Sequence, residues 1–555
     1  MTSPNPALVS QLAVQRLPRV PLLLLCAAYV LPGLFHRDPW KGADITAFGY
    51  MVQMAEGRTS WLNPLVAGWP LDNALLPHWL GAVFIWLLSP WVDPAFAARL
   101  PFAALLAGTL ALTWYACFHF ARSDAAQPLP FAFGGEANTV DYARAMADGA
   151  LLALIASLGL LQLGHETTPE LAQLFSAALL MWSLAAAAFR PARARWLVLL
   201  ALPLLAACGA PAMAVIGGCW AVFVQRHQSR DDPTLRGFWR WTAAGTALAA
   251  GLAWLLGTWA WRWEFTGTGS QLGTIARLWL WFMWPAWLLA LWTVWRWRRQ
   301  LLQRHLAVPL GLVAVALGAS IAMGGSDRAL MLGLPPLAVL AAFALPTLKR
   351  GTSAAVDWFS VFFFTGCAVL GWVIYSAMQI GVPAKPAANI ARLAPGFVPE
   401  FGAPELLFAL AGTVAWLALV RWRTGRHRAA LWKSLVLPAS GVVLCWLLVM
   451  TLWLPPINYG RSYRPWVERI APHVGPHECI AAPMLPRGAL AALTYFGGWQ
   501  VEGRQSGPHT GCAVLMLSPQ QPAPPGWQPV ARVQRPTDRR DRQVLYRRVV
   551  AGQGG

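Results

Sequence analysis

The chain has 555 residues, of which 57% are apolar and only 12% are charged, whereas soluble domains carry about 25% charged residues. Its apolar residues come in blocks of about 18 to 25, long enough for helices to cross a hydrocarbon core. The formal net charge is +20, but the basic residues form short clusters between apolar blocks, as in cytoplasmic loops of membrane proteins. These features exclude an ordinary soluble enzyme, argue against a nucleic-acid partner and predict a polytopic membrane protein.

The basic clusters predict the topology. Arg16 and Arg19 precede the first apolar block, and no small-residue cleavage site follows it, which indicates an uncleaved first helix. The later clusters predict about thirteen crossings of a bacterial inner (plasma) membrane, with the N-terminus cytoplasmic and the C-terminus periplasmic. The predicted spans are 18–35, 97–120, 148–164, 171–189, 196–208, 211–225, 240–262, 276–295, 306–324, 329–347, 354–379, 404–421 and 433–454.

The apolar segment 75–90 could either span the membrane or lie on its surface. If it spanned, every later loop would be inverted and the arginine clusters would face the periplasm, against the usual charge distribution. The segment is short and bounded by Pro77 and Pro90, which favours an interfacial helix. We therefore predict a first periplasmic loop over 36–96, as part of a transmembrane domain that covers 1–455.

A second surface helix is predicted near 45–57, in the same loop. Its apolar side chains recur at helical spacing, at Ile45, Phe48, Val52 and Ala55. Such a stripe suits a helix that lies on a membrane surface.

The composition changes after about residue 456, where polar and proline-rich sequence alternates with short apolar runs. The runs at 479–482, 513–517 and 544–550 read as strands, and 486–495 reads as a helix. We predict a small periplasmic α/β domain over 456–555. Cys479 and Cys512 both lie in it, and an exported domain favours a disulfide between them.

The most informative stretch is 36–44 (HRDPWKGAD), immediately outside the first predicted helix. Asp38 and Asp44 would lie there at the membrane surface. A carboxylate in that place could take a proton from a nucleophile, with cations or a metal binding a leaving phosphate. The alternative is that Asp44 only caps the following helix.

Three segments resemble a known family. They are W-x-x-A-D at 40–44, LDNALLPHWLGAVFIWLL at 71–88 and FAARLPFAALLAGTLALTWYACFHFAR at 96–122. The chain resembles the GT-C glycosyltransferases, in the aminoarabinose-transferase and protein O-mannosyltransferase branch, over residues 1–190 and again over 326–345. The resemblance implies an all-α polytopic fold and transfer of a sugar from a polyprenyl-phosphate donor to a lipid, glycan or protein acceptor at the periplasmic face.

The resemblance also implies roles for individual residues. Asp44 matches the family's catalytic aspartate, Asp72 a glutamate, Arg99 the arginine of R-L-P, and Glu170 a second conserved acid. The matches imply that Asp44 acts as the general base or orients the acceptor, with Asp72 and Glu170 assisting. They also imply that Arg99 binds the donor phosphate. His165 stands where the family has an arginine. Two positions depart from the pattern, because Ile45 replaces an acid and Asn73 replaces the lysine associated with the lipid phosphate.

Arg328 is a candidate to bind the donor phosphate in place of that missing lysine, since an arginine binds phosphate in bidentate fashion. Its alternative is an ion pair with the neighbouring Asp327. A divalent cation shared by Asp44, Glu166 and Glu170 is a further possibility, because hard cations take carboxylates. The competing interpretation is that these acids simply end helices at the water interface. The string H-E-T-T-P-E at 165–170 lacks the second histidine of a zinc-protease motif.

Two other functions stay open. A transporter or lipid flippase would carry charges in mid-membrane and broken helices in related halves, whereas the charges here gather at the ends of the apolar blocks. A non-catalytic family member is the second alternative, because of the replacements at Ile45 and Asn73.

Overall fold

The computed structural model describes residues 7–72, 74–228, 236–259, 263–424, 430–504, 511–522, 524–538 and 542–549. Asn73 lies outside the described residues. The chain forms two compact units. The first comprises Met1–Pro32, Phe102–Val369 and Leu407–Leu448, and the second comprises Gly33–Pro101, Leu370–Leu406 and Val449–Gly555.

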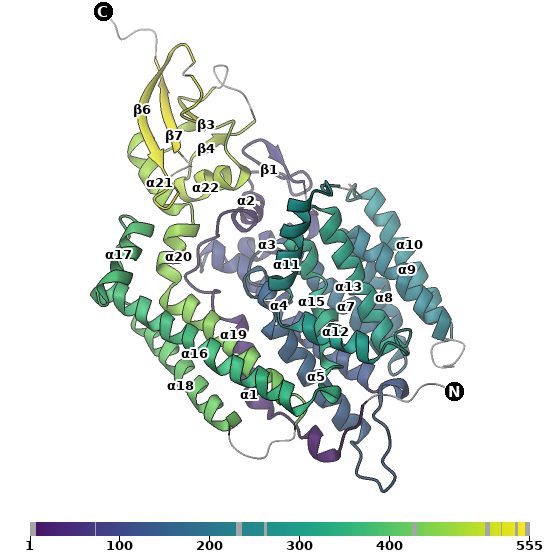
Figure 1. Ribbon diagram of the computed structural model, residues 1–555. Helices are drawn as coiled ribbons and strands as arrows, with labels where there is room; N and C mark the ends of the chain where they lie inside the picture. Colours follow the sequence, from purple (N-terminus) through teal and green to yellow (C-terminus); the bar gives the residue numbers. More distant parts are fainter. Residues whose placement is uncertain are drawn as a thin grey trace, which may run out of the picture. The chain divides into compact units, whose positions relative to one another are not determined.

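Helices dominate the chain (Figure 1). Their bounds are α1 Arg19–Val30, α2 Ala43–Ala55, α3 Leu75–Leu88, α4 Pro94–Ala121, α5 Thr139–Ala156, α6 Leu158–Leu163, α7 Pro169–Ala186, α8 Pro191–Ala207, α9 Pro211–Gln228, α10 Phe238–Leu255, α11 Gly269–Phe282, α12 Ala286–Arg296, α13 Arg304–Ala322, α14 Asp327–Met331, α15 Leu334–Ala342, α16 Arg350–Ile380, α17 Ala384–Leu393, α18 Ala403–Thr424, α19 Lys433–Leu452, α20 Leu454–Arg461, α21 Arg464–Ile470 and α22 Arg487–Gly497. The strands are β1 Leu65–Val66, β2 Trp69–Pro70, β3 Cys479–Ala481, β4 Gln500–Glu502, β5 Val514–Leu517, β6 Trp527–Gln534 and β7 Arg542–Arg548.

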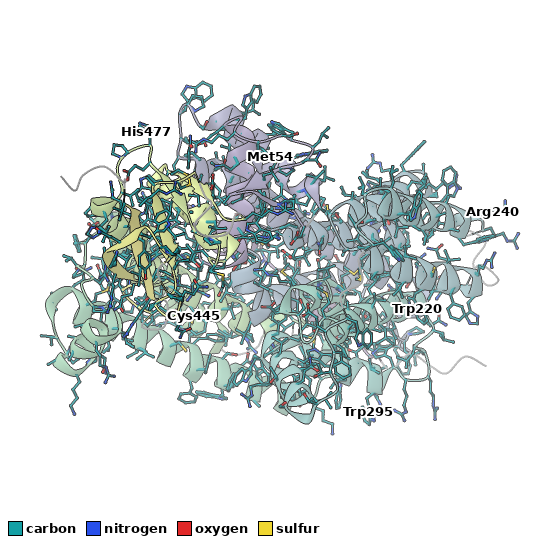
Figure 2. All side chains as sticks on the ribbon, turned by 90° about the horizontal axis from the view of Figure 1, so that it is seen from above. Met54, Trp220, Arg240, Trp295, Cys445 and His477 are labelled. Carbon is teal, nitrogen blue, oxygen red and sulfur yellow. A yellow bond between two sulfur atoms is a disulfide. The ribbon has the colours of Figure 1, made fainter. Side chains whose placement is uncertain are left out.

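The first unit is a helical bundle. Helices α8, α9 and α10 pack side by side (Figure 1), and α15 packs against α5, α12 and α13. Tryptophans such as Trp295, which is 55% exposed, project from the outside of the helices (Figure 2). Exposed indole rings suit the boundary between hydrocarbon and headgroups.

Six described helices are long and apolar enough to cross a membrane, namely α4, α7, α13, α16, α18 and α19. The bent pair α11 and α12 would make a seventh. The chain is therefore a multi-pass membrane protein. The predicted number of thirteen spans is not confirmed and stays a prediction.

Several predicted spans are broken in the structure. The span predicted at 276–295 is the pair α11 and α12, which meet at an angle of 93°, and 329–347 is divided between α14 and α15. The span predicted at 148–164 is similarly divided after Ala156, and the first span shortens to the twelve residues of α1. Hydropathy averages over such breaks, so it predicts continuous helices where the backbone turns.

The second unit contains the predicted C-terminal α/β domain. Its five strands have the order β4-β3-β5-β7-β6, with β3 parallel to β4 and β5, and β7 antiparallel to β5 and β6. Strands β3, β4, β6 and β7 are labelled in Figure 1. Helix α22 forms the crossover between the parallel strands β3 and β4, which cannot be joined by a tight turn. The sheet and the crossover helix confirm the predicted small α/β domain.

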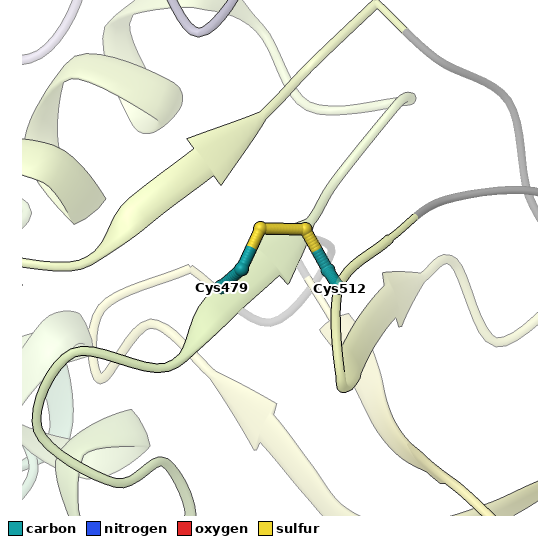
Figure 3. The surroundings of a disulfide bond; sticks show 2 residues. All are labelled: Cys479 and Cys512. Carbon is teal, nitrogen blue, oxygen red and sulfur yellow. A yellow bond between two sulfur atoms is a disulfide. The ribbon is translucent and has the colours of Figure 1, made fainter.

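Cys479 and Cys512 form a disulfide in this sheet (Figure 3). Cys479 begins β3 and Cys512 lies just before β5, with Cα atoms 4.7 Å apart. That separation is within the usual range for a disulfide. The bond joins two neighbouring strands next to the apolar core formed by residues such as Leu515 and Tyr546.

Helix α2 lies where a surface helix was predicted, but it is buried on more than one face. Its buried residues include Ile45 and Met51, and it packs against α3 and α22. Two glycines permit the close approach. A Cβ atom on Gly49 would lie 2.5 Å from the Cβ of Ala491, and one on Gly488 would lie 3.1 Å from Ile45. The prediction of a helix with one apolar stripe on a membrane surface therefore misses its packing in the second unit.

Candidate functional site

A cavity of about 540 Å³ lies within the second unit. Its charged lining consists of three arginines and two aspartates, namely Arg37, Arg99, Arg464, Asp38 and Asp93. The residues come from three places in the sequence: the loop after α1, the start of α4, and the C-terminal segment. The cavity therefore combines cations that can bind an anion with carboxylates that can accept a proton.

The loop that carries Arg37 and Asp38 is held by one side chain from α20. The Asn458 amide donates to the carbonyl oxygen of His36 at 2.8 Å, and its oxygen accepts from the backbone N–H of Asp38 at 3.3 Å and the indole N–H of Trp40 at 3.0 Å. These bonds hold His36 at φ 55°, a left-handed conformation that is unfavourable for a residue with a side chain. Asn458 thus fixes the backbone on which the cavity is built.

Replacing Asn458 by alanine is expected to lower the free energy of unfolding by about 1–3 kcal/mol, since three hydrogen bonds are lost. Thermal unfolding of the purified protein in detergent measures the change. The matched control is Asn389→Ala, because Asn389 is exposed and, among the described residues, its side chain accepts only a local bond from Arg392. An equal loss in both variants would contradict the assigned role of Asn458.

Asp44 lies beside the cavity and is not part of its lining. Its carboxylate is 2% exposed, accepts from the fully buried Arg37 guanidinium at 3.3 Å and accepts from the backbone N–H of Trp40 at 3.1 Å. The residue at the cap position of α2 is Gly42, with φ 98°, and Asp44 is the second residue of the helix. The interpretation of Asp44 as the N-cap is therefore wrong. The carboxylate holds Arg37 against the cavity.

Arg99 extends from the second turn of α4. Helix α4 begins at Pro94 because the Asp93 carboxylate accepts from the backbone N–H groups of Ala95 and Phe96, at 2.9 and 3.0 Å. The Arg99 guanidinium is 5% exposed and donates through Nη1 to the carbonyl oxygen of Leu34 at 3.3 Å. Its Nη2 is buried and has no hydrogen-bond partner among the described residues. A buried cation with an unused donor can bind an anion.

Two residues of the C-terminal segment complete the cavity. Arg464 donates to both oxygens of Asp38, at 2.8 and 3.0 Å, and this hydrogen bonding raises the pKa of the Arg464 guanidinium above its ordinary value. The Tyr495 hydroxyl donates to Asp93 at 3.4 Å. Burial, reinforced by the Asp93 carboxylate, raises the pKa of Tyr495 well above its usual range, so the hydroxyl stays a proton donor.

Asp72 lies outside the cavity lining. Its side chain is 42% exposed and forms an ion pair with Arg487 of α22 at 2.6 Å. The Arg487 guanidinium also lies over the Trp69 ring, 5.3 Å from its centre. These contacts connect the first loop to α22, and they indicate a positioning role for Asp72.

A second charged cluster lies in the first unit, around Arg328. Its guanidinium donates to Glu166 at 2.6 Å, to Glu170 at 3.2 Å and to the Thr168 hydroxyl at 3.1 Å. Burial lowers the pKa of Arg328, but the carboxylates of Glu170 and Glu166 raise it above its ordinary value overall. Among the described ion pairs, Arg328 pairs with these two acids and not with Asp327, so the predicted alternative of a pair with Asp327 is wrong.

His165 follows the end of α6, and both of its ring nitrogens lie close to backbone carbonyl oxygens. Its Nδ1 is 2.7 Å from the oxygen of Leu161, and its Nε2 is 2.8 Å from the oxygen of Tyr29. The imidazole also packs against the Trp446 ring, with centres 4.5 Å apart. These contacts join three segments of the first unit, so His165 is placed as a packing and positioning residue.

Candidate metal ligands were predicted among Asp44, Glu166 and Glu170. Asp44 belongs to the second unit, and the two glutamates of the first unit share the Arg328 guanidinium, whose single positive charge offsets one of their two negative charges. In the part of the chain that the structure describes, three ligand atoms come within 4.8 Å only at Cys479, Cys512 and Glu502. The two sulfurs there are in the disulfide and are not thiolates. Within each unit, the described residues offer no set of three such ligand atoms that includes one of these acids.

No model of a known protein family matches the sequence, and no curated protein sequence matches it. Solved structures do match. The crystal structure of ArnT from Cupriavidus metallidurans bound to undecaprenyl phosphate is similar to this chain, with a TM-score of 0.60 and 14% sequence identity, over 97% of this chain and 100% of that chain. The apo structure of the same protein gives a TM-score of 0.57 and 15% identity, over 97% and 99%. The chain has the GT-C fold. The fold expected from the three sequence segments is thereby confirmed.

Within this GT-C fold, the predicted site residues divide between the two units. In the second unit, Asp38, Asp44 and Arg99 lie at the cavity or directly behind it. In the first unit, Glu166 and Glu170 surround Arg328, while His165 contacts Leu161, Tyr29 and Trp446. Asp72 lies apart from the cavity lining in the second unit.

The partners of the first loop in this GT-C fold were not predicted from the sequence. Asn458 and Arg464 are more than 400 residues away from Asp38, and Tyr495 is farther still. One signal was present, because the polar run 456–470 follows the last predicted span directly and would also meet the membrane surface. Without a pattern that links it to the loop at 36–44, the run read only as the start of the C-terminal domain.

Removing the Arg328 cation is expected to destabilise the GT-C helical unit. Arg328→Met leaves Glu166, whose side chain is 6% exposed, without this cation, so we expect a loss of about 2–4 kcal/mol in the free energy of unfolding. Thermal unfolding in detergent measures the loss. Arg328→Lys keeps the charge and should recover part of the stability. If the methionine variant is as stable as the wild type, the cluster does not hold the unit together.

Proposed function

We propose that this protein transfers a sugar from a polyprenyl-phosphate-linked donor to an acceptor at the periplasmic face of the bacterial inner membrane. The fold supports this, since it is the fold of an ArnT structure that contains undecaprenyl phosphate. The observation that carries the proposal is the buried Arg99 guanidinium, whose Nη2 has no partner among the described residues and which lines a cavity with Arg37 and Arg464.

The cavity suits the phosphate of a lipid-linked donor. Arg99 is near the start of α4, a 28-residue helix apolar enough to span a membrane, so the site lies where a lipid headgroup meets the hydrocarbon. Arg37 and Arg99 would share the phosphate oxygens, and their low exposure strengthens the attraction by excluding water. The lipid phosphate bond carries the activation of the sugar, so no nucleotide is required outside the cell.

The transfer needs one proton acceptor. An acceptor hydroxyl attacks the anomeric carbon, the new carbon–oxygen bond forms, and the bond from that carbon to the phosphate oxygen breaks. Polyprenyl phosphate leaves with the electron pair, and the hydroxyl proton goes to a carboxylate. We assign this role to Asp38, because it lines the cavity and the other lining carboxylate, Asp93, is occupied in starting α4 and in binding Tyr495.

Asp44 then has a different role from the one that the family resemblance implies. We assign it to holding Arg37 in the phosphate site, because its carboxylate is buried and bonded to that guanidinium. Asp72 and the Glu166–Arg328–Glu170 cluster are assigned to positioning, through the ion pairs that each forms. The predicted domains, 1–455 in the membrane and 456–555 in the periplasm, and the cytoplasmic N-terminus are part of this proposal.

The direct test is a transfer assay in proteoliposomes. Purified protein is supplied with undecaprenyl phosphate that carries a radiolabelled sugar, and with a membrane extract as the source of lipid, glycan and protein acceptors. We expect the label to leave the lipid-phosphate fraction with at least one sugar of a panel, and free undecaprenyl phosphate to accumulate. Movement of the donor across the bilayer without transfer would indicate a flippase. A donor that is bound but never consumed would indicate a non-catalytic protein.

A further inference from the structure

Arg464 and Asp38 form an ion pair inside the proposed phosphate cavity. The Arg464 side chain is 50% exposed, whereas Asp38 is 15% exposed, and both carboxylate oxygens accept from the same guanidinium. The guanidinium also lies over the Phe496 ring, 4.6 Å from its centre. Arg464 is thus the most exposed of the three cavity arginines and the one whose partner also lines the cavity.

This pairing conflicts with the role of Asp38 as a proton acceptor. Both carboxylate oxygens of Asp38 already accept hydrogen bonds from the Arg464 guanidinium, so neither is open to the hydroxyl group of an acceptor. Asp38 could act only after the guanidinium moved away from it. A half-exposed ion pair contributes little net stability, so an incoming anion can compete for it.

We propose that Arg464 is an exchangeable phosphate contact, which leaves Asp38 for the lipid phosphate when the donor enters and thereby frees Asp38 to accept the acceptor's proton. This inference rests on the proposed function. The exchange links donor binding to proton transfer from the acceptor, because the catalytic carboxylate becomes available only in the donor complex.

The other cavity groups are not free to exchange in this way. Asp93 starts α4 through two backbone N–H groups and accepts from Tyr495. Arg37 is fully buried and bonded to Asp44, which is behind the cavity lining. Of the cavity ion pairs among the described residues, Asp38–Arg464 is the one that is part-exposed and has both members on the lining.

The test measures the affinity of undecaprenyl phosphate, in nanodiscs, for the wild type, Asp38→Asn, Arg464→Gln and the double variant. Asp38→Asn releases Arg464 for the phosphate, so we expect affinity to rise about three- to tenfold, and Arg464→Gln should lower it by a similar factor. In the Arg464→Gln background, Asp38→Asn should have little further effect, because the cation that it releases is gone.

Several results would contradict the exchange. If Asp38→Asn does not tighten binding, the carboxylate does not compete with the phosphate for Arg464. If it tightens binding equally without Arg464, the carboxylate acts by general repulsion and the exchange is wrong. If both single variants lower the unfolding temperature and leave affinity unchanged, the pair is purely structural. Arg469→Gln is the matched control, since Arg469 donates to the carbonyl of Gln534 and is not on the cavity lining. No binding by the wild type would overturn the proposed phosphate site itself, and the exchange with it.

Discussion

Replacing Arg99 by glutamine is expected to weaken binding of undecaprenyl phosphate by about ten- to hundredfold, the effect of removing one charged hydrogen-bonding partner of a buried anion. Arg99 is 5% exposed, and its Nη2 has no partner among the described residues, so the variant would remove a buried, charged donor from the phosphate site. Titration of the lipid into protein in nanodiscs measures the change.

Two variants control this experiment. Arg99→Lys keeps the charge but loses the forked geometry, and we expect an intermediate affinity. Arg487→Gln removes an arginine of the same unit that pairs with Asp72 outside the cavity lining, and it should leave affinity unchanged. Equal weakening by the Arg99 and Arg487 variants would show that the lipid responds to overall charge and not to the cavity.

Asp38→Asn is expected to lower kcat by about 10²–10⁴-fold, the usual contribution of a positioned proton acceptor, without weakening donor binding. The asparagine keeps the size of the side chain but cannot take the proton of the acceptor. Single-turnover transfer with a saturating lipid-linked donor separates this loss from any change in affinity.

Asp44→Asn is the comparison that distinguishes the two aspartates. Because Asp44 holds the buried Arg37, its loss should act mainly through the phosphate site and raise the dissociation constant of the donor by about three- to tenfold. If Asp44→Asn instead abolishes turnover while donor binding stays at the wild-type level, Asp44 is the proton acceptor, as the family resemblance implies, and the assignment to Asp38 is wrong.

The sequence was sufficient to predict the fold because short, ordered motifs carry it. The stretch W-x-x-A-D, the segment 71–88 and the segment around Arg99 occur in chain order within the first 122 residues. The apolar blocks placed most helices within a few residues of their observed bounds. The sequence did not show whether an apolar block forms one unbroken helix, since a break such as that between α11 and α12 depends on packing and not on hydropathy.

The candidate site was predictable only in part, for a physical reason. Asp38, Asp44 and Arg99 belong to the local motifs, so their neighbourhood was clear from the sequence. Their partners Asn458 and Arg464 come from a segment more than 400 residues away, and pairing over that separation is determined by the folded chain. Burial also depends on contacts between distant parts of the chain. Asp44 is buried behind Arg37 and does not line the cavity.

The most direct test of the proposed phosphate site is an experimental structure of the protein with undecaprenyl phosphate bound. We expect the phosphate to lie in the cavity of the second unit, within hydrogen-bonding distance of Arg99 Nη2, with Arg464 turned from Asp38 toward it. A phosphate bound at the Arg328 cluster, or anywhere else outside that cavity, would show that the assigned site is wrong.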